Sequence, residues 1–79
     1  MKVKLLFFGA LTDIVGMQEE TIDVDDNLDI TYLNLDLLSR YPSLSNFKYK
    51  IALNKVVVDK DQKLRDGDEV AFLPPFAGG

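Results

Sequence analysis

Apolar and polar positions alternate in the first part of the chain. Val3, Leu5 and Phe7 fall on one face of the segment 2–8, which therefore predicts a strand with a wholly apolar face. A short segment over residues 10–15 is closed by Gly16, and alternation then returns over residues 17–24 with acids on the outward side. The two alternating stretches predict a β-hairpin with a long connection.

The segment 27–41 carries two competing patterns. Positions 28, 30 and 32 alternate as in a strand, whereas the apolar residues at 30, 33, 37 and 38 form a helical stripe. Asp29 can cap a helix N-terminus, and Pro42 stops a helix just after Arg40. Because both ends carry helix signals, we predict a helix here.

The remainder predicts short strands joined by turns. A loop over residues 43–46 is followed by strands at 49–53 and 56–58, which flank a tight Asn54-Lys55 turn. Asp66-Gly67 marks the next turn, before a strand at 69–73. The order strand, strand, helix, strand, strand, strand implies an α+β fold, a mixed sheet with one main helix packed across one face. This order resembles the ubiquitin-like β-grasp, in which the first and last strands lie side by side and parallel. We expect residues 1–73 to form this domain and residues 74–79 to form a flexible, extended C-terminal tail.

The residue types that the chain lacks exclude several kinds of catalytic and metal site. The 79 residues include no cysteine and no histidine. Thiolate catalysis, disulfides and Cys or His metal sites are thereby excluded, and a serine or threonine nucleophile would lack a histidine base. We expect no metal site and no bound cofactor. No apolar run approaches the roughly 18 residues that span a bilayer, so we expect no membrane association and a cytoplasmic location.

Charge is distributed unevenly along the chain. The net charge is −4, which argues against a nucleic-acid partner. Between Lys4 and Arg40 there are eight acidic residues and no basic one. Two interpretations remain open: a solvated acidic face that keeps a small protein soluble, or a surface that steers the protein toward a basic partner.

The C-terminal residues carry the candidate chemistry. Pro74 and Pro75 cannot continue a central strand, so the chain must leave the sheet there. The last six residues, extended, reach roughly 18 Å. Phe76 and Ala77 precede Gly78 and Gly79, whose missing side chains let a narrow channel admit the chain and leave the terminal carboxylate accessible. We therefore predict that Gly79 carries the reactive group and that residues 74–78 form a partner-binding tail.

The segments VKLLFFGALTDIVG at residues 3–16 and LRDGDEVAFLPPFAGG at residues 64–79 resemble the start and end of the molybdopterin synthase small subunit. The segment IALN at residues 51–54 resembles the hairpin of that family. The resemblance covers essentially the whole chain. The strand DGDEV followed by Pro-Pro and a terminal Gly-Gly is its most specific part.

This resemblance implies a sulfur carrier in molybdenum cofactor biosynthesis. A ubiquitin-activating-like adenylyltransferase would use ATP and Mg²⁺ to adenylate the carboxylate of Gly79, and sulfur would then replace one oxygen to give a thiocarboxylate. The tail would deliver this sulfur to cyclic pyranopterin monophosphate in the large synthase subunit. The resemblance further implies a heterotetramer in which the small subunit donates sulfur and the active site lies in the large subunit.

A docking face is expected on the sheet, and one departure from the family bears on it. Leu6 and Phe8 fall opposite the apolar face of the first strand, and Leu73, or Ala71, would lie beside them if the terminal strands pair. Because one helix cannot cover both faces, we predict that Leu6, Phe8 and Leu73 form a docking site for the large subunit. Where the family often has an Arg-Glu pair, this chain has Thr12-Asp13, which puts any contact made by that arginine in doubt.

Three alternatives remain. A thiamin-type sulfur carrier shares the fold and the Gly-Gly end, although its tail does not usually carry Pro-Pro. A ubiquitin-like modifier would use the same carboxylate to form an isopeptide with lysine. A binding module without a covalent role would be unaffected by deletion of Gly78 and Gly79.

Overall fold

The computed structural model describes residues 1–75. Helices and strands follow one another along most of this length. Their bounds are β1 (Lys2–Phe7), α1 (Ala10–Val15), β2 (Glu19–Asp23), α2 (Ile30–Arg40), the 3₁₀ helix η1 (Pro42–Asn46), β3 (Lys50–Leu53), β4 (Val56–Val58) and β5 (Glu69–Leu73).

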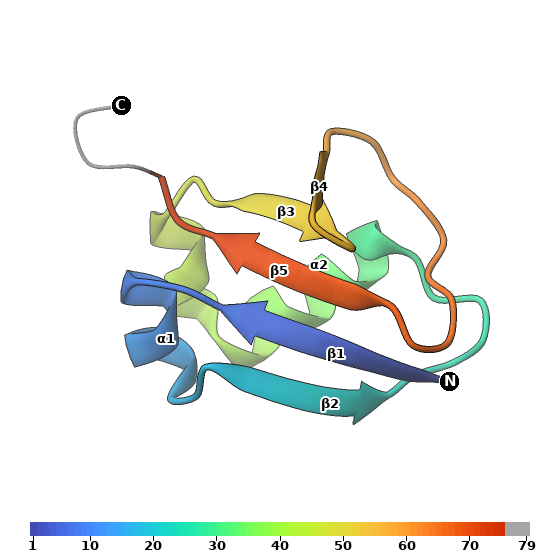
Figure 1. Cartoon of the computed structure of the whole chain (residues 1–79). Coiled ribbons are helices and arrows are strands. Elements are labelled where there is room, and N and C mark those ends of the chain that lie inside the picture. The colour runs from blue at the N-terminus through green and yellow to red at the C-terminus, as the bar shows by residue number, and fades with distance from the viewer. Residues whose placement is uncertain (76–79) are drawn as a thin grey trace.

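The strands form one mixed sheet in the order β2-β1-β5-β3-β4 within residues 1–75. β1 and β5 lie parallel at its centre, with Leu5 opposite Val70 and Leu6 opposite Ala71. The other pairs are antiparallel, including the β1–β2 hairpin expected from the alternation. α2 crosses behind the sheet, and the carboxyl ends of β1 and β5 point to the same end of the molecule (Figure 1). The predicted parallel pairing of the first and last strands is confirmed.

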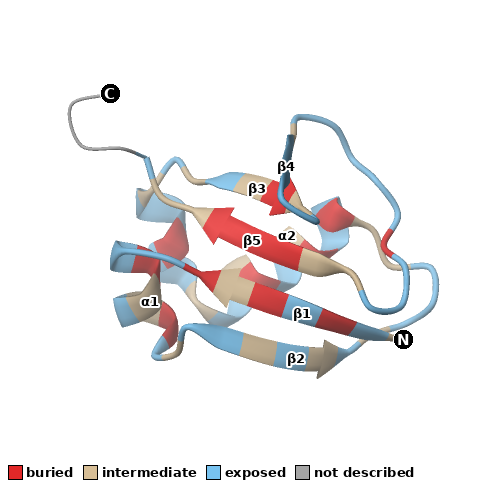
Figure 2. Ribbon diagram, in the orientation of Figure 1, coloured by how far each residue is buried: buried red, intermediate tan, exposed pale blue. Residues whose placement is uncertain are grey.

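The core lies between the sheet and α2. Alternate residues of the central strands are buried there, and α2 contributes Ile30, Leu33 and Leu37 from its helical stripe (Figure 2). The rings of Phe7 and Phe72 stack with their centroids 5.3 Å apart, which joins the two parallel strands through their side chains. The fully buried side chains on this face supply most of the favourable free energy of folding, because each removes a large apolar area from water.

α2 begins and ends where its sequence signals predict. The Asp29 carboxylate accepts a hydrogen bond from the amide of Tyr32 at 2.9 Å, as an N-cap does. The Asp61 carboxylate accepts from the amide of Thr31 at 3.0 Å, so the loop before β5 satisfies a second amide of the first turn. The helix ends at Arg40, two residues before Pro42. The preference for helix over strand in this segment is confirmed.

The structure adds helical turns that the sequence pattern did not assign. Residues 10–15 form α1, with Leu11 and Val15 buried and Gly16 in the left-handed conformation (φ 85°) after its last turn. A segment of six residues is too short for a helical period to show, so the sequence pattern alone does not predict its structure. The expected loop after Pro42 is the 3₁₀ helix η1, which buries Leu44 against the core.

The β3–β4 hairpin turns at Asn54 and Lys55, as predicted. Both residues have positive φ, 49° and 73°, which is the conformation of a tight two-residue hairpin turn. The Asn54 side chain also accepts from the amide of Glu69 at 2.9 Å and donates to Asp68 at 3.0 Å. This one side chain therefore ties the hairpin to the start of β5.

Candidate functional site: the uncovered sheet face and the root of the tail

The face of the sheet opposite α2 carries an apolar patch near the end of β1. In the parallel β1–β5 pair, Leu6 lies opposite Ala71, and Leu73 follows two residues further on the same face. Leu6 and Leu73 are half-buried, and Ala71 is 8% exposed. Phe8, just after β1, is 46% exposed and lines a hollow of about 440 Å³ together with Leu6. We call Leu6, Phe8, Ala71 and Leu73 the apolar patch.

The other end of the same face is charged. Lys4 pairs with Glu19 and Lys2 pairs with Asp23, each at 3.0 Å. The hydrogen bond to Glu19 raises the pKa of Lys4, and the hydrogen bond from Lys2 lowers the pKa of Asp23. All four side chains are well exposed, so these pairs contribute little to stability and mainly keep this end of the face hydrated. Along β1 the uncovered face therefore changes from ionic at Lys2 and Lys4 to apolar at Leu6, where Glu19 of β2 lies opposite.

The root of the tail lies beside the corner between β1 and α1. β5 ends at Leu73, and neither Pro74, which is half-buried, nor Pro75, which is exposed, is part of a strand. Gly9 turns the corner with a φ of +56°, and a Cβ added there would come within 3.0 Å of Cγ of Pro74. Glycine at this position thus lets the first residue of the tail pack against the corner. Nothing in the sequence pattern predicts this contact, although a glycine directly after an apolar run signals a turn.

Thr12 holds the same corner in place. Its hydroxyl donates to the carbonyl oxygen of Phe7 at 3.1 Å, and its amide donates to the carbonyl oxygen of Gly9 at 3.1 Å. These bonds close the turn that links β1 to α1. At the position where this chain departs from the family pattern, the threonine therefore fixes the backbone beside the root of the tail.

The structure brings several of the sequence-predicted site residues to one end of the sheet. Leu6, Phe8 and Leu73 lie at the end of the central strands from which Pro74 and Pro75 continue. The remaining candidates, Phe76, Ala77, Gly78 and Gly79, lie outside the described residues. The structure therefore describes the base of the tail and the sheet face around it.

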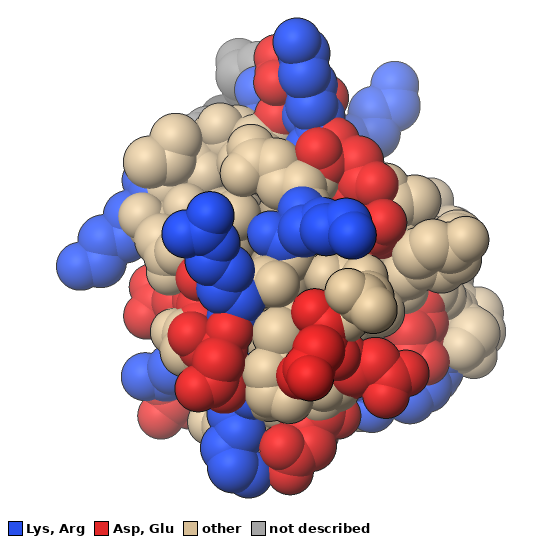
Figure 3. All heavy atoms as spheres, turned by 90° about the vertical axis from the view of Figure 1, so that its right-hand side faces the viewer, with Lys and Arg blue, Asp and Glu red and all other residues tan. Residues whose placement is uncertain are grey.

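Residues 1–75 contain no group of three or more acidic, histidine or cysteine side chains placed to hold a metal ion. No helix within these residues is long and apolar enough to cross a membrane. At the end of the molecule away from the tail root, carboxylates gather in the middle and lower part of the surface, with lysine and arginine side chains above and among them (Figure 3).

A mixed sheet with parallel central strands, a main helix across one face and a double proline after the last strand defines a ubiquitin-like β-grasp protein. Comparison with known proteins places the chain within this class. It belongs to the ThiS family, whose model matches residues 5–79.

Relatives with established names resemble the chain over its whole length. The molybdopterin synthase sulfur carrier subunit of Mycobacterium tuberculosis is 34% identical, and the alignment covers 100% of this chain and 99% of the relative. The protein of the same name from Chlamydomonas reinhardtii is 32% identical, with both chains fully covered. Among solved structures, the complex of subunits 1 and 2 of the molybdopterin-converting factor from Helicobacter pylori contains a chain that is 29% identical, with a TM-score of 0.70 and full coverage of both chains.

Proposed function

We propose that this protein is the sulfur carrier subunit of a molybdopterin synthase and that it carries sulfur as a thiocarboxylate on Gly79. The main observation in support of this proposal is that the apolar patch lies at the root of the tail. A partner that binds this patch also receives the chain that leaves the sheet at Pro74. Membership of the ThiS family and the names of the full-length relatives support the same function.

The proposed chemistry takes place at the terminal carboxylate. An adenylyltransferase, using ATP and Mg²⁺, joins a carboxylate oxygen of Gly79 to the α-phosphate of ATP and releases pyrophosphate. Sulfide then attacks the carbonyl carbon, and AMP leaves with the oxygen, so that a thiocarboxylate remains. The absence of cysteine and histidine from the chain is consistent with a carrier that holds sulfur on its backbone terminus.

The second proposed step occurs in the large synthase subunit. The thiocarboxylate sulfur bonds to an oxygen-bearing side-chain carbon of cyclic pyranopterin monophosphate, and the carbon–oxygen bond at that carbon breaks. Water then hydrolyses the acyl–sulfur bond, which leaves the sulfur on the pterin and restores the carboxylate of Gly79. Two deliveries complete the dithiolene. This chain supplies the nucleophile and its delivery, whereas the pocket and the proton-transfer groups belong to the large subunit. We propose a heterotetramer of two small and two large subunits in the cytoplasm.

The apolar patch is the proposed docking surface for the large subunit. Phe8 is a large side chain with nearly half of its surface in water, and burial of such a ring is a strong source of binding free energy. The H. pylori complex of subunits 1 and 2 supports a partner of this kind. The ion pairs Lys4–Glu19 and Lys2–Asp23 would lie toward the polar rim of the interface.

Intact-protein mass spectrometry tests this proposal most directly. The protein is incubated with ATP, Mg²⁺, a sulfide source and its adenylyltransferase. The expected result is a mass gain equal to the replacement of one oxygen by sulfur, located at Gly79 by fragmentation and absent from a variant that lacks Gly79. An unchanged carboxylate, under conditions in which the same enzyme activates a control carrier, would reject the sulfur-carrier function. Isopeptide-linked adducts on other proteins instead of a thiocarboxylate would favour the modifier function.

A further inference from the structure

A second surface lies on the opposite end of the sheet from the tail. A hollow of about 530 Å³ separates the end of β2 from the first turns of α2. Its lining includes the carboxylates Asp23, Asp25 and Asp36 together with the side chains of Leu28, Tyr32 and Leu33. Asp23 lies opposite Lys2 at the start of β1, whereas the tail continues from the far end of β5. We call this hollow the β2–α2 groove.

β2 borders the groove and forms one edge of the sheet. Met1 and Val24 exchange two backbone hydrogen bonds of 2.9 Å, and the amide of Phe7 donates to the carbonyl oxygen of Gln18 at 2.8 Å. In an antiparallel ladder the pairing alternates, so Glu20 and Ile22 direct their backbone groups toward β1. The amides and carbonyls of Glu19, Thr21 and Asp23 point away from the sheet. Within residues 1–75 β2 has a partner strand on one side only, which leaves these groups available to another strand.

The side chains along this edge differ between its two sides. On the uncovered face of the sheet, Glu19 and Asp23 project carboxylates that are 60% and 74% exposed. On the α2 side, Leu33 is buried at 1% exposure, Leu28 is half-buried, and the Tyr32 ring is 64% exposed. A strand added beside β2 would alternate between these two environments. Residues pointing to the uncovered face would meet the carboxylates of Glu19 and Asp23. Residues pointing to the α2 side would meet Leu28 and the Tyr32 ring, with the carboxylates of Glu20, Asp25 and Asp36 beside them.

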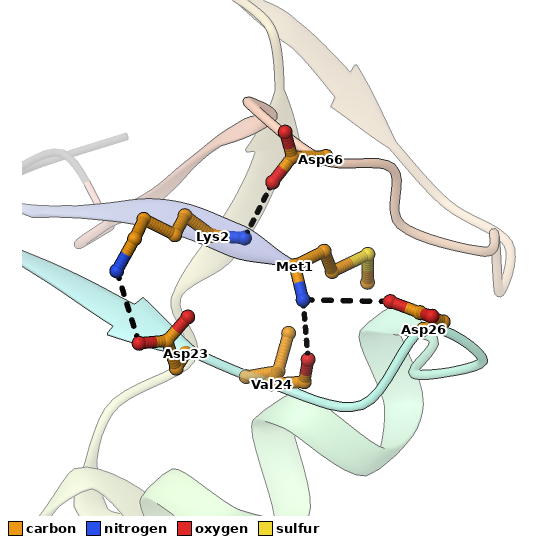
Figure 4. A network of polar contacts seen from close by, with 6 residues as sticks. All are labelled: Met1, Lys2, Asp23, Val24, Asp26 and Asp66. Carbon is orange, nitrogen blue, oxygen red and sulfur yellow. Dashed lines mark hydrogen bonds and ion pairs between the residues drawn. The ribbon is translucent and has the colours of Figure 1, made fainter.

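Cations of the protein pair with most of the carboxylates around the groove and leave Asp25 as the unpaired one among the described residues. Lys2 pairs with Asp23 at 3.0 Å, and the terminal amine of Met1 lies 3.4 Å from Asp26 (Figure 4). Arg40 pairs with Asp36 at 3.4 Å. In the described residues the Asp25 side chain has no hydrogen-bond or ion-pair partner. The carboxylates of the three pairs are exposed, so an incoming cation can replace or join these contacts at little cost.

We infer that the β2–α2 groove binds an extended protein segment of alternating basic and apolar residues, which pairs with β2 as an additional strand. The backbone of the segment would use the outward groups of Glu19, Thr21 and Asp23. Its basic side chains would meet the carboxylates, and its apolar side chains would cover Leu28 and the Tyr32 ring. Pairing of β2 with β2 from a second copy is opposed by the acids on both strands. The groove lies at the opposite end from the tail root, whereas the added strand would extend as far as Glu19, which lies opposite Leu6 and lines the hollow next to Phe8.

Nuclear magnetic resonance of the full chain tests this inference. The probe is an acetylated and amidated nine-residue peptide of alternating arginine and valine. The expected result is that the amides of Glu19, Thr21 and Asp23 gain protection from hydrogen exchange by about tenfold or more. Those of Glu20 and Ile22, already paired with β1, change little. Chemical-shift changes should extend to Leu28 and Tyr32.

Two charge variants make the test specific. Asp25→Lys should weaken binding of the peptide by about fivefold or more, because an attraction becomes a repulsion at the groove. Asp59→Lys makes the same change in net charge at an exposed site after β4, and it should leave the affinity within about twofold. Equal losses in the two variants would show attraction by overall charge and overturn the inference.

A third variant tests strand pairing. Thr21→Pro removes an outward amide from the edge of β2 and should abolish the exchange protection, whereas Thr21→Val, which keeps the amide, should preserve it. If the proline variant does not fold, the alternating protection pattern in the unchanged protein decides the question. Protection of β4 instead of β2, self-association without peptide, or no binding at millimolar peptide would each reject the inference.

Discussion

The two faces of the central strands show how neighbouring residues in one strand take on different tasks. Leu5 is completely buried under α2, whereas Leu6, the next residue, is half-buried on the opposite face beside Ala71. On the covered face, side chains gain free energy by leaving water during folding. On the uncovered face, apolar side chains stay in contact with water, and the proposed docking of the large subunit would bury them. Under this proposal, the difference between the faces is a division between stability and recognition.

The largest expected effect is loss of stability on the covered face. Leu5→Ala should lower the free energy of unfolding by about 3 kcal/mol, because the truncation leaves a cavity in the core. Leu6→Ala removes the same atoms from the other face and should cost less than about 1 kcal/mol. Urea denaturation followed by circular dichroism measures both. Similar losses in the two variants would mean that the faces do not differ as described.

The next effect concerns recognition on the uncovered face. Phe8→Asp should weaken binding to the large synthase subunit by roughly tenfold to a hundredfold, because it places a charge in an apolar interface. Its free energy of unfolding should change by less than about 1 kcal/mol, since the ring is well exposed. Isothermal titration calorimetry gives the affinity, with Val56→Asp, which makes the same kind of change at an exposed position on β4, as the control. Normal binding by the Phe8 variant would show that the apolar patch is not part of the interface.

A smaller effect is expected at the turn that joins β3 to β4. Asn54→Ala should destabilise the fold by roughly 1–2 kcal/mol, because alanine is strained at positive φ and the bonds to Asp68 and Glu69 are lost. Asn54→Gly accepts the same φ but also lacks the amide, so its loss should be smaller. Thermal unfolding separates the two contributions. Equal losses would indicate that the side-chain hydrogen bonds account for the whole effect.

The smallest effect concerns how the stability of the fold at the start of α2 depends on pH. The backbone amide of Thr31, at the start of α2, donates to Asp61 and lowers the pKa of that carboxyl below its ordinary value of 3.8. A lowered pKa in the folded state contributes stability above pH 3.8, and this contribution is lost as the pH falls through the folded pKa. Asp61→Asn should therefore destabilise at pH 6 and converge toward the original protein near pH 2. A difference independent of pH would argue against the ionised hydrogen bond.

The sequence predicted the parts of the fold in which a pattern repeats. Alternation assigned β1 and β2, and the Asp29 cap with Pro42 marked the bounds of α2. α1 was not assigned because its buried residues, Leu11 and Val15, are too few to show a period. The packing of Pro74 against Gly9 was also not predicted, because a contact between such distant parts of the chain depends on the parallel pairing of β1 and β5. Periodicity reports local structure, whereas this contact arises only from topology.

The parallel pairing of the first and last strands also has a consequence for biosynthesis. Leu5 of β1 pairs with Val70 of β5, which is near the other end of the sequence. β1 therefore leaves the ribosome long before β5 has been synthesised, and the central ladder forms only afterwards. Contacts so distant in sequence slow folding relative to a helical domain of equal size. A chain that stops before β5 cannot complete the sheet, nor does it contain the tail. Translation thus couples the appearance of residues 74–79 to the completion of the fold.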